Sequence, residues 1–205
     1  DITGALDLGN TMHGIYVASG ANNTIGGTTA GSRNVISGNN DAGVYITGAS
    51  ATGNSVLGNY IGTDATGMLD LGNSTDGIVL HNGASDNTIG GTTVAHRNII
   101  SGNDNDGIWI TSTGTSGNTV QGNWIGLDAA GGALGNSYHG IGVQNGASDN
   151  LIGGTAAGAA NTIANNAWEC IPTNNTRTGN AFLGNESNAT GHLGVASKAY
   201  TQTCS

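Results

Sequence analysis

A repeat of 63–64 residues constrains the fold of this chain more than any other feature. The motif RNVISGN at residues 33–39 returns as RNIISGN at 97–103 and, in altered form, as ANTIANN at 160–166. Each copy follows a shorter motif, TIGG or LIGG, that begins nine residues earlier. The chain therefore contains three copies of one structural unit, and we expect these units to stack along one axis.

Each repeat contains two rungs, and a rung opens with alternating apolar residues after a glycine. The openings are GIYV at Gly14, GVYI at Gly43, GIVL at Gly77, GIWI at Gly107, GIGV at Gly140 and the irregular CIPT at Cys170. Successive openings lie 29, 34, 30, 33 and 30 residues apart, so long and short rungs alternate. Short runs rich in Val and Ile, with Gly and Asn between them, are typical of β-strands joined by tight bends. No window shows the spacing of an amphipathic helix.

A rung this small cannot bury its own apolar face, so we expect rungs to stack about 4.8 Å apart as parallel sheets. Alternation predicts two inward columns, Ile15, Val44, Ile78, Ile108, Ile141 and Ile25, Val56, Ile89, Val120, Ile152. One corner carries asparagine on each rung, at Asn23, Asn54, Asn87, Asn118 and Asn150. Stacked amides can hydrogen-bond along such a column.

These motifs, together with GNYIGTDATG at residues 58–67, resemble the right-handed parallel β-helix proteins, the superfold shared by pectate lyases and many bacterial and archaeal surface proteins. We expect one all-β domain over residues 1–205, a right-handed parallel β-helix of about six rungs. Within it, 1–13 is an incomplete first rung, 14–169 contains the regular rungs, and 170–205 is an irregular final rung and tail. A start in mid-repeat without a signal peptide is expected of a mature or trimmed product.

The charge balance is acidic, with 4 basic against 13 acidic residues and a net charge of −9. A chain with so few cations is not expected to bind nucleic acid or anionic membranes, and no apolar run is long enough for a transmembrane helix. Cys170 and Cys204 are interpreted as a disulfide, which indicates an extracellular or cell-surface location; the alternative is two buried thiols. Candidate N-glycosylation sites are Asn22, Asn73, Asn174, Asn185 and Asn188.

The resemblance raises the question of an enzyme, because the superfold's lyases use a calcium-binding acidic cluster with an Arg or Lys base and its hydrolases use clustered aspartates. Arg33 and Arg97 occupy the same repeat position, as do His13 and His139, whereas an active site should be unique. We interpret the arginines as carbonyl caps or partners of loop acids, and the histidines as corner residues. The prediction is a protein without catalytic residues.

The loop at residues 62–73 places Asp64 and Asp70 in one compact turn, and Asp128 is the repeat equivalent of Asp64. Oxygen-rich loops suit calcium. However, Ala133 replaces the second aspartate in the next copy, so we favour Asx-turn closure and expect no cofactor, with calcium as the alternative.

Aromatic residues recur at outward positions. Alternation places Tyr16, Tyr45, Val79, Trp109 and Gly142 in one outward column, and Tyr60 and Trp124 form an equivalent pair on another strand. Such rings are candidates for binding sugars or a neighbouring protein chain; the alternative is ordinary packing between rungs.

The first hypothesis is therefore a non-catalytic extracellular structural protein, a β-helix subunit of a surface layer, adhesin or filament. We expect its terminal rungs to associate head to tail, because an open sheet edge is a template for the next copy. The alternative is a carbohydrate-binding module, or a polysaccharide lyase or hydrolase of the same superfold.

Overall fold

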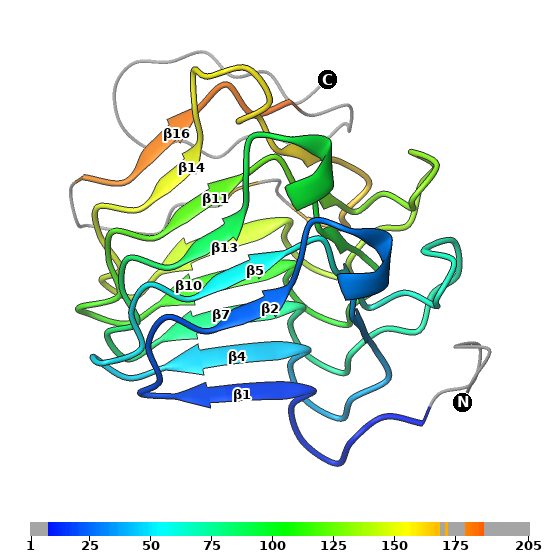
Figure 1. The fold of residues 1–205 in the computed structure, drawn as a ribbon, viewed down its shortest axis with the longest axis horizontal. Coiled ribbons are helices and arrows are strands. Elements are labelled where there is room, and N and C mark those ends of the chain that lie inside the picture. Colours follow the sequence, from blue (N-terminus) through cyan, green and yellow to red (C-terminus); the bar gives the residue numbers. More distant parts are fainter. Residues whose placement is uncertain (1–7, 169–170, 172–178, 187–205) are drawn as a thin grey trace.

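The chain forms a solenoid of three parallel sheets in a computed structural model that describes residues 8–168, 171 and 179–186 (Figure 1). Sheet A contains β1 (Ile15–Ala18), β4 (Val44–Thr47), β7 (Ile78–His81), β10 (Ile108–Thr111) and β13 (Ile141–Gln144). Sheet B contains β2 (Thr24–Gly26), β5 (Ser55–Leu57), β8 (Thr88–Gly90), β11 (Thr119–Gln121), β14 (Leu151–Gly153) and β16 (Ala181–Leu183). Sheet C contains β3 (Val35–Ile36), β6 (Tyr60–Ile61), β9 (Ile99–Ile100), β12 (Trp124–Ile125) and β15 (Thr162–Ile163). The predicted parallel β-helix is confirmed.

Strands within each sheet pair in the predicted register. Ile15 pairs with Val44 and Val44 with Ile78 in sheet A, and Ile25 pairs with Val56 in sheet B. Both inward columns therefore form a continuous core, in which the isoleucines of the inner rungs are completely buried. Ile171 also belongs to this core, although most of the irregular final rung, with Cys170, Cys204, Arg177, Asn174 and Asn188, lies outside the described residues.

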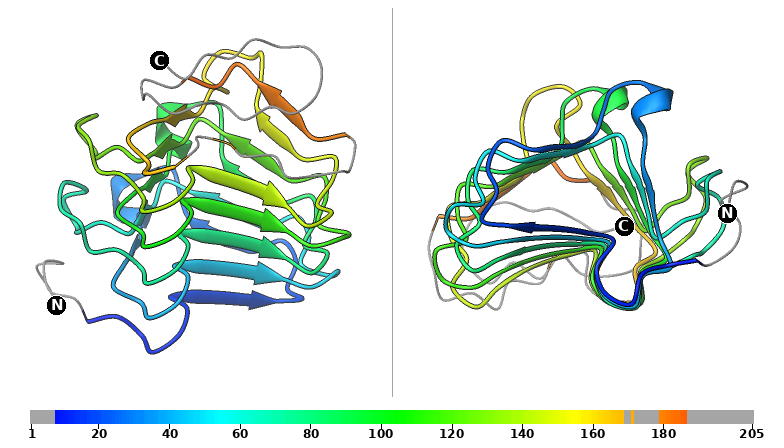
Figure 2. Two further views of the ribbon diagram at one scale, coloured as in Figure 1. Left: turned by 180° about the vertical axis from the view of Figure 1, so that it is seen from behind. Right: turned by 60° about the horizontal axis from the view of Figure 1, so that its bottom comes forward.

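Two kinds of loop explain why long and short rungs alternate. In one rung of each pair, the link from sheet B to sheet C is long, and in the first two pairs it contains a 3₁₀ turn, η1 (Ala30–Ser32) or η2 (Val94–His96). In the other, that link is short, as between Leu57 and Tyr60, and the long loop instead connects sheet C to sheet A, as between Ile61 and Ile78. Seen along the stack, the strands superpose whereas these loops project outward (Figure 2). Across the described part of the chain, no helix is long and apolar enough to cross a bilayer.

The corners are held by three columns of asparagines, buried on the inner rungs, of which sequence analysis identified one. The columns are Asn23, Asn54, Asn87, Asn118, Asn150, Asn180 before sheet B; Asn34, Asn59, Asn98, Asn123, Asn161, Asn185 before sheet C; and Asn10, Asn39, Asn73, Asn103, Asn136, Asn166 after sheet C. In each, the side-chain amide donates to the amide oxygen of the next rung. It generally also donates to a backbone carbonyl, as Asn98 does to Val56 at 2.9 Å. All three ladders therefore run in the same direction along the stack.

Candidate functional site

The corner that leads into sheet A differs from the asparagine corners, because its side chain changes from rung to rung. The residues before the opening glycines are His13, Ala42, Asp76, Asp106 and His139. Backbone hydrogen bonds align them: the opening glycines of the first four rungs donate to the carbonyl of the corner residue on the next rung, as Gly43 does to Asp76 at 3.0 Å. Glycine is needed there, because a β-carbon at Gly43 would lie only 2.8 Å from the Gly77 carbonyl oxygen. A fixed backbone thus presents variable side chains.

An aromatic cluster with histidines lies at the N-terminal end of this corner. The His13 ring stacks on Tyr45, with centroids 4.4 Å apart, and on Tyr16 at 5.4 Å. Asp41 places Oδ2 3.5 Å from His13 Nδ1, and its Oδ1 accepts hydrogen bonds from the Ala42 amide and the Thr75 hydroxyl. This arrangement joins an exposed tyrosine, Tyr16, to a partly buried group of polar side chains.

Tyr45 also reaches across to the next rung of sheet A, and its hydroxyl lies 2.7 Å from His81 Nδ1. Burial, helped by the neighbouring Tyr16, raises the pKa of Tyr45, whereas burial lowers the pKa of His81. Both shifts favour the neutral forms. We therefore assign the phenol as the donor and a neutral imidazole as the acceptor.

Two aspartates occupy the middle of the corner, on consecutive rungs. Asp76 Oδ1 accepts hydrogen bonds from Asn105 Nδ2 and the Asp106 amide, and Asp106 Oδ1 accepts one from the His139 amide. Only 4% of Asp76 and 3% of Asp106 is exposed. Burial raises the pKa of Asp76 to about 6, and burial together with the nearby Asp76 charge raises the pKa of Asp106 to about 7. The pair therefore holds a proton well above the usual range of carboxyl groups.

A second aromatic cluster lies at the C-terminal end. The ring centroids of Tyr138 and His139 are 4.1 Å apart, and those of Tyr138 and Trp168 are 4.9 Å apart. The Trp168 amide donates to the Tyr138 carbonyl, so this tryptophan extends the corner by one rung. Its side chain is 58% exposed. An open indole face is therefore available at this end.

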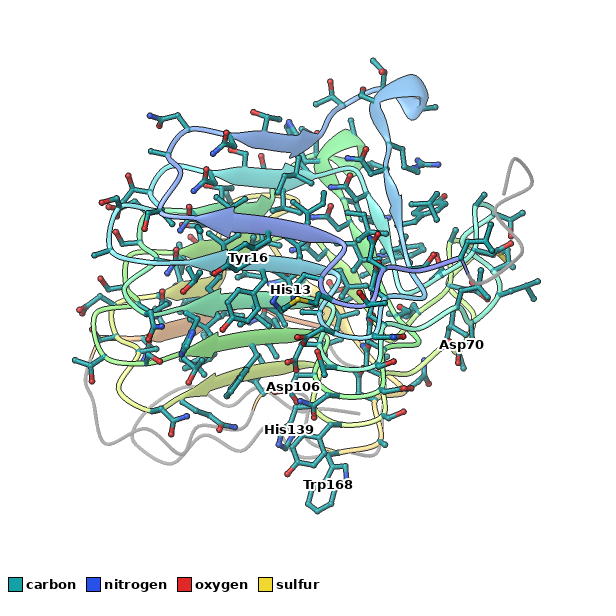
Figure 3. The ribbon with its side chains drawn as sticks, turned by 90° about the horizontal axis from the view of Figure 1, so that it is seen from below. His13, Tyr16, Asp70, Asp106, His139 and Trp168 are labelled. Carbon is teal, nitrogen blue, oxygen red and sulfur yellow. The ribbon has the colours of Figure 1, made fainter. Side chains whose placement is uncertain are left out.

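We call the whole row the sheet A line. It comprises His13, Tyr16, Asp41, Tyr45, Asp76, Asp106, Trp109, Tyr138, His139 and Trp168. Figure 3 shows Tyr16, His13, Asp106, His139 and Trp168 following one another across the rungs, whereas Asp70 lies away from them among the loops. The line combines exposed aromatic rings, such as Tyr16 and Trp168, with the buried acids Asp76 and Asp106.

The predicted outward column is only partly an exposed aromatic surface. The register places its five residues in one column as expected, and Tyr16 is 60% exposed. However, Val79 is 1% exposed and Gly142 is buried. The aromatic rings of the column are therefore Tyr16, which is exposed, and Tyr45 and Trp109, which are half-buried.

Tyr60 and Trp124, predicted as a second binding pair, have their faces covered. The Arg33 guanidinium lies 4.0 Å from the Tyr60 ring centroid, and that of Arg97 lies 4.2 Å from the Trp124 ring. Each arginine also donates from Nε to a backbone carbonyl, Gly58 and Gly122 respectively, as the carbonyl-cap interpretation required. A β-carbon on Gly67 would lie 2.8 Å from Tyr60 Cε2, which shows that the loop packs against this ring. These rings therefore act in packing.

The loop aspartates close turns, in agreement with the favoured interpretation. Asp64 Oδ1 accepts from the Met68 and Leu69 amides and from the Thr66 hydroxyl, and Asp128 Oδ1 accepts from the Ala130 and Gly132 amides. Burial alone would raise the pKa of Asp64, but the hydrogen bonds from Leu69, Thr66 and Met68 outweigh it and lower the pKa. Asp70 Oδ1 accepts from the Gly72 amide. Within the residues described, no three His, Cys, Asp or Glu side chains are grouped to hold a metal.

Two of the glycosylation candidates are corrected by the ladders. Asn73 is completely buried and its Nδ2 donates to Asn103 Oδ1 at 2.8 Å, and Asn185 is 9% exposed and its Nδ2 donates to the Ile152 carbonyl at 3.0 Å. A glycan on either amide would remove those bonds, so neither is available in the folded chain. Asn22 is exposed in a turn with φ 58°, and remains a candidate.

Sequence analysis missed Asp41, Tyr138, Trp168 and the Asp76–Asp106 pair as parts of one site. Their rungs are separated by about 30 residues, and each residue is unremarkable in its own segment. The sequence signal that could have found this site is the residue before each opening glycine, which differs from one rung to the next.

No protein-family model and no curated protein matches the sequence. Among solved structures, the fold is similar to that of a double mutant of the periplasmic alginate epimerase AlgG, with a TM-score of 0.55 and 16% identity over 89% of this chain and 37% of that chain. Another structure of this epimerase aligns at a TM-score of 0.45 and 13% identity over 88% of this chain and 48% of that chain. The chain thus spans less than half the length of the epimerase. At such low identity the similarity shows the fold alone.

Proposed function

We propose that this protein binds a polysaccharide along the sheet A line, with the sugar units following one another from rung to rung across the strands. The observation that carries the proposal is the mixture of exposed aromatic rings and hydrogen-bonding groups along six consecutive rungs. Five steps of about 4.8 Å give a line of roughly 24 Å, long enough for several sugar units.

Each part of the line suits a part of a sugar. Tyr16 and Trp168 are 60% and 58% exposed and offer ring faces that pack against the C–H faces of pyranoses. Between them, the second carboxyl oxygens of Asp76 and Asp106 receive no hydrogen bond from the described residues and can accept hydrogen bonds from hydroxyls. The protein similar in fold is an alginate epimerase of the periplasm, and alginate is a polysaccharide. By that analogy we also place this protein outside the cytoplasm.

The proposal is limited to binding. Proton-transfer atoms in the N-terminal cluster already face one another: the Tyr45 hydroxyl contacts His81 Nδ1, and His13 Nδ1 faces Asp41. A general acid or base has to reach the proton that it transfers. We therefore assign no reaction to these groups.

Affinity electrophoresis through gels containing neutral, acidic or amino polysaccharides tests the proposal. We expect at least one class to retard the protein, with retardation reduced by Trp168→Ala and by Tyr16→Ala. Tyr60→Ala is the matched control, because that ring is covered by Arg33. Failure of all three classes to retard the protein, or equal retardation of every variant, would contradict the proposal.

End-to-end stacking is the second candidate, and the direction of the ladders supports it. In the first described rung, the amide oxygens of Asn10, Asn23 and Asn34 accept no hydrogen bond from any described residue. Beside them lies a hollow of about 300 Å³ lined partly by Leu8, Ile15 and Val35. A rung presenting amide donors, such as one from a second copy, would continue the ladders there.

Analytical ultracentrifugation with negative-stain electron microscopy tests this second candidate. Stacking predicts rods that lengthen with protein concentration and shorten in the variant Asn23→Leu, which removes one acceptor from the open edge. A species that stays monomeric at all concentrations would rule it out, without bearing on polysaccharide binding.

A further inference from the structure

The sheet A line is acidic, and this restricts what it can bind. Asp41, Asp76 and Asp106 lie on consecutive rungs of the line. In the described part of the chain, Arg33 and Arg97 are the cationic side chains that never lose their charge, and both lie beside sheet C, over Tyr60 and Trp124. With a net charge of −9 overall, the protein attracts cationic ligands and repels anionic ones.

Asp106 has one carboxyl oxygen directed toward the outer face of sheet A. Its Oδ1 accepts the His139 amide, whereas no donor to Oδ2 is found among the described residues. A β-carbon at Gly142 would lie 2.6 Å from this Oδ2 and 3.2 Å from Trp109 Cδ1. The missing side chain of Gly142 therefore leaves Asp106 Oδ2 and the edge of the Trp109 indole beside the same point on β13.

Asp76, one rung earlier, also uses only one carboxyl oxygen in the protein's own hydrogen bonds. Both bonds to its carboxyl group go to Oδ1, from Asn105 and from the Asp106 amide. Two carboxyl groups, each more than nine-tenths buried, thus lie on adjacent rungs with one oxygen apiece outside the protein's own hydrogen bonds. Ionising both acids costs free energy because like charges are then buried together, and a cation beside them would offset that cost.

We propose that the polysaccharide carries free amino groups, and that Asp76 and Asp106 bind an ammonium group of a hexosamine unit beside Trp109. This inference rests on the proposed function. An ammonium group has three donors for the free carboxyl oxygens and offsets the repulsion between the two acids. A uronate would instead bring a third carboxylate to the pair.

Isothermal titration calorimetry with four β-1,4-linked oligosaccharides of equal length tests the inference. These are oligomers of glucosamine, N-acetylglucosamine, glucose and mannuronate, measured at about pH 7, above the pKa of Asp76 and close to that of Asp106. We expect the glucosamine oligomer to bind at least about tenfold more tightly than the acetylated one. In Asp106→Asn this preference should fall close to onefold, while the weak affinity for the neutral oligomers is retained.

Asp70→Asn is the matched control, because it removes the same charge from an exposed loop away from the line (Figure 3). It should keep the preference for free amines. Equal affinity for the glucosamine, acetylated and glucose oligomers, or tighter binding of the uronate, would overturn this inference and leave polysaccharide binding intact. If none of the four binds, and the gels show no retardation, the proposed function itself fails.

Discussion

The two kinds of corner in this solenoid differ in how they vary along the stack. Around sheets B and C every described rung presents an asparagine, and each amide bonds to the same residue on the next rung. At the corner leading into sheet A the residues are histidine, alanine, aspartate, aspartate and histidine. A residue kept on every rung serves the stack. Where the backbone is regular but the side chain changes from rung to rung, the side chain is not needed for stacking on every rung and can contact a ligand.

Interrupting an asparagine ladder should have the largest effect on stability. Asn98 is completely buried; it accepts from Asn59 and donates to Asn123 and to the Val56 carbonyl. Asn98→Leu leaves several of these groups without partners, each at a cost of about 1–3 kcal/mol. We expect a loss of about 4 kcal/mol or more in the free energy of unfolding, measured by urea denaturation.

Asn40→Ala is the control for the ladder, because Asn40 is exposed and donates only its backbone amide, to Asn10. Its effect should stay within about 0.5 kcal/mol. Equal effects of the two substitutions would mean that the ladders contribute no more than surface asparagines.

The line should behave in the opposite way, so that removing one of its acids stabilises the protein. The pKa of Asp106 is raised to about 7 in the folded state, so this group favours folding below its unfolded pKa of about 4 and loses that contribution as the pH rises to about 7. At about pH 8, Asp106→Asn should therefore raise the free energy of unfolding by about 3 kcal/mol, and at about pH 4 by almost nothing.

Thermal unfolding at several pH values measures this difference. The wild-type protein should lose stability between about pH 4 and pH 7, and the variant should lose less of it. A wild-type stability that rises across this window would mean that Asp76 and Asp106 are not the protonated pair that their burial implies.

Two tyrosines sharpen the comparison between packing and binding. Tyr60→Ala removes a ring held between Arg33 and the loop at Gly67, and should cost about 2 kcal/mol of stability without changing affinity for the polysaccharide. Tyr16→Ala should leave stability nearly unchanged and reduce affinity about tenfold, about 1.4 kcal/mol. Denaturation and calorimetry on both variants test this pair, and exchanged outcomes would reverse the assignment of the two surfaces.

The smallest expected effect belongs to the repeated arginines. Arg97→Lys keeps the charge but loses the planar contact with Trp124 and the Nε bond to the Gly122 carbonyl. We expect a loss of about 0.5–1 kcal/mol and a shift in tryptophan fluorescence, with no change in ligand affinity. A loss of binding would assign a ligand role to the sheet C side.

The sequence was sufficient for the fold because alternation and repeat length act together. The inward columns and the ladder at Asn23 follow from strands of constant spacing, with 31, 33, 31, 32 and 30 residues between successive asparagines. The ladder that begins at Asn34 was not recognised, because the separations between its successive asparagines are 25, 39, 25, 38 and 24 residues. They alternate because the long link between sheets B and C occurs only on every second rung. The site escaped for a different reason: His13 and Asp41, or Tyr138 and Trp168, come together only through pairing between rungs.

The two alternating loop types also determine how a chain of this kind can change its length. A rung bonds only to the rungs beside it, and the loop pattern returns after 63–64 residues. Duplicating or deleting one whole repeat therefore restores every strand pair and every ladder, whereas another length brings the wrong residues opposite one another. Recombination between repeats can thus lengthen or shorten the sheet A line in steps of two rungs while the fold stays the same.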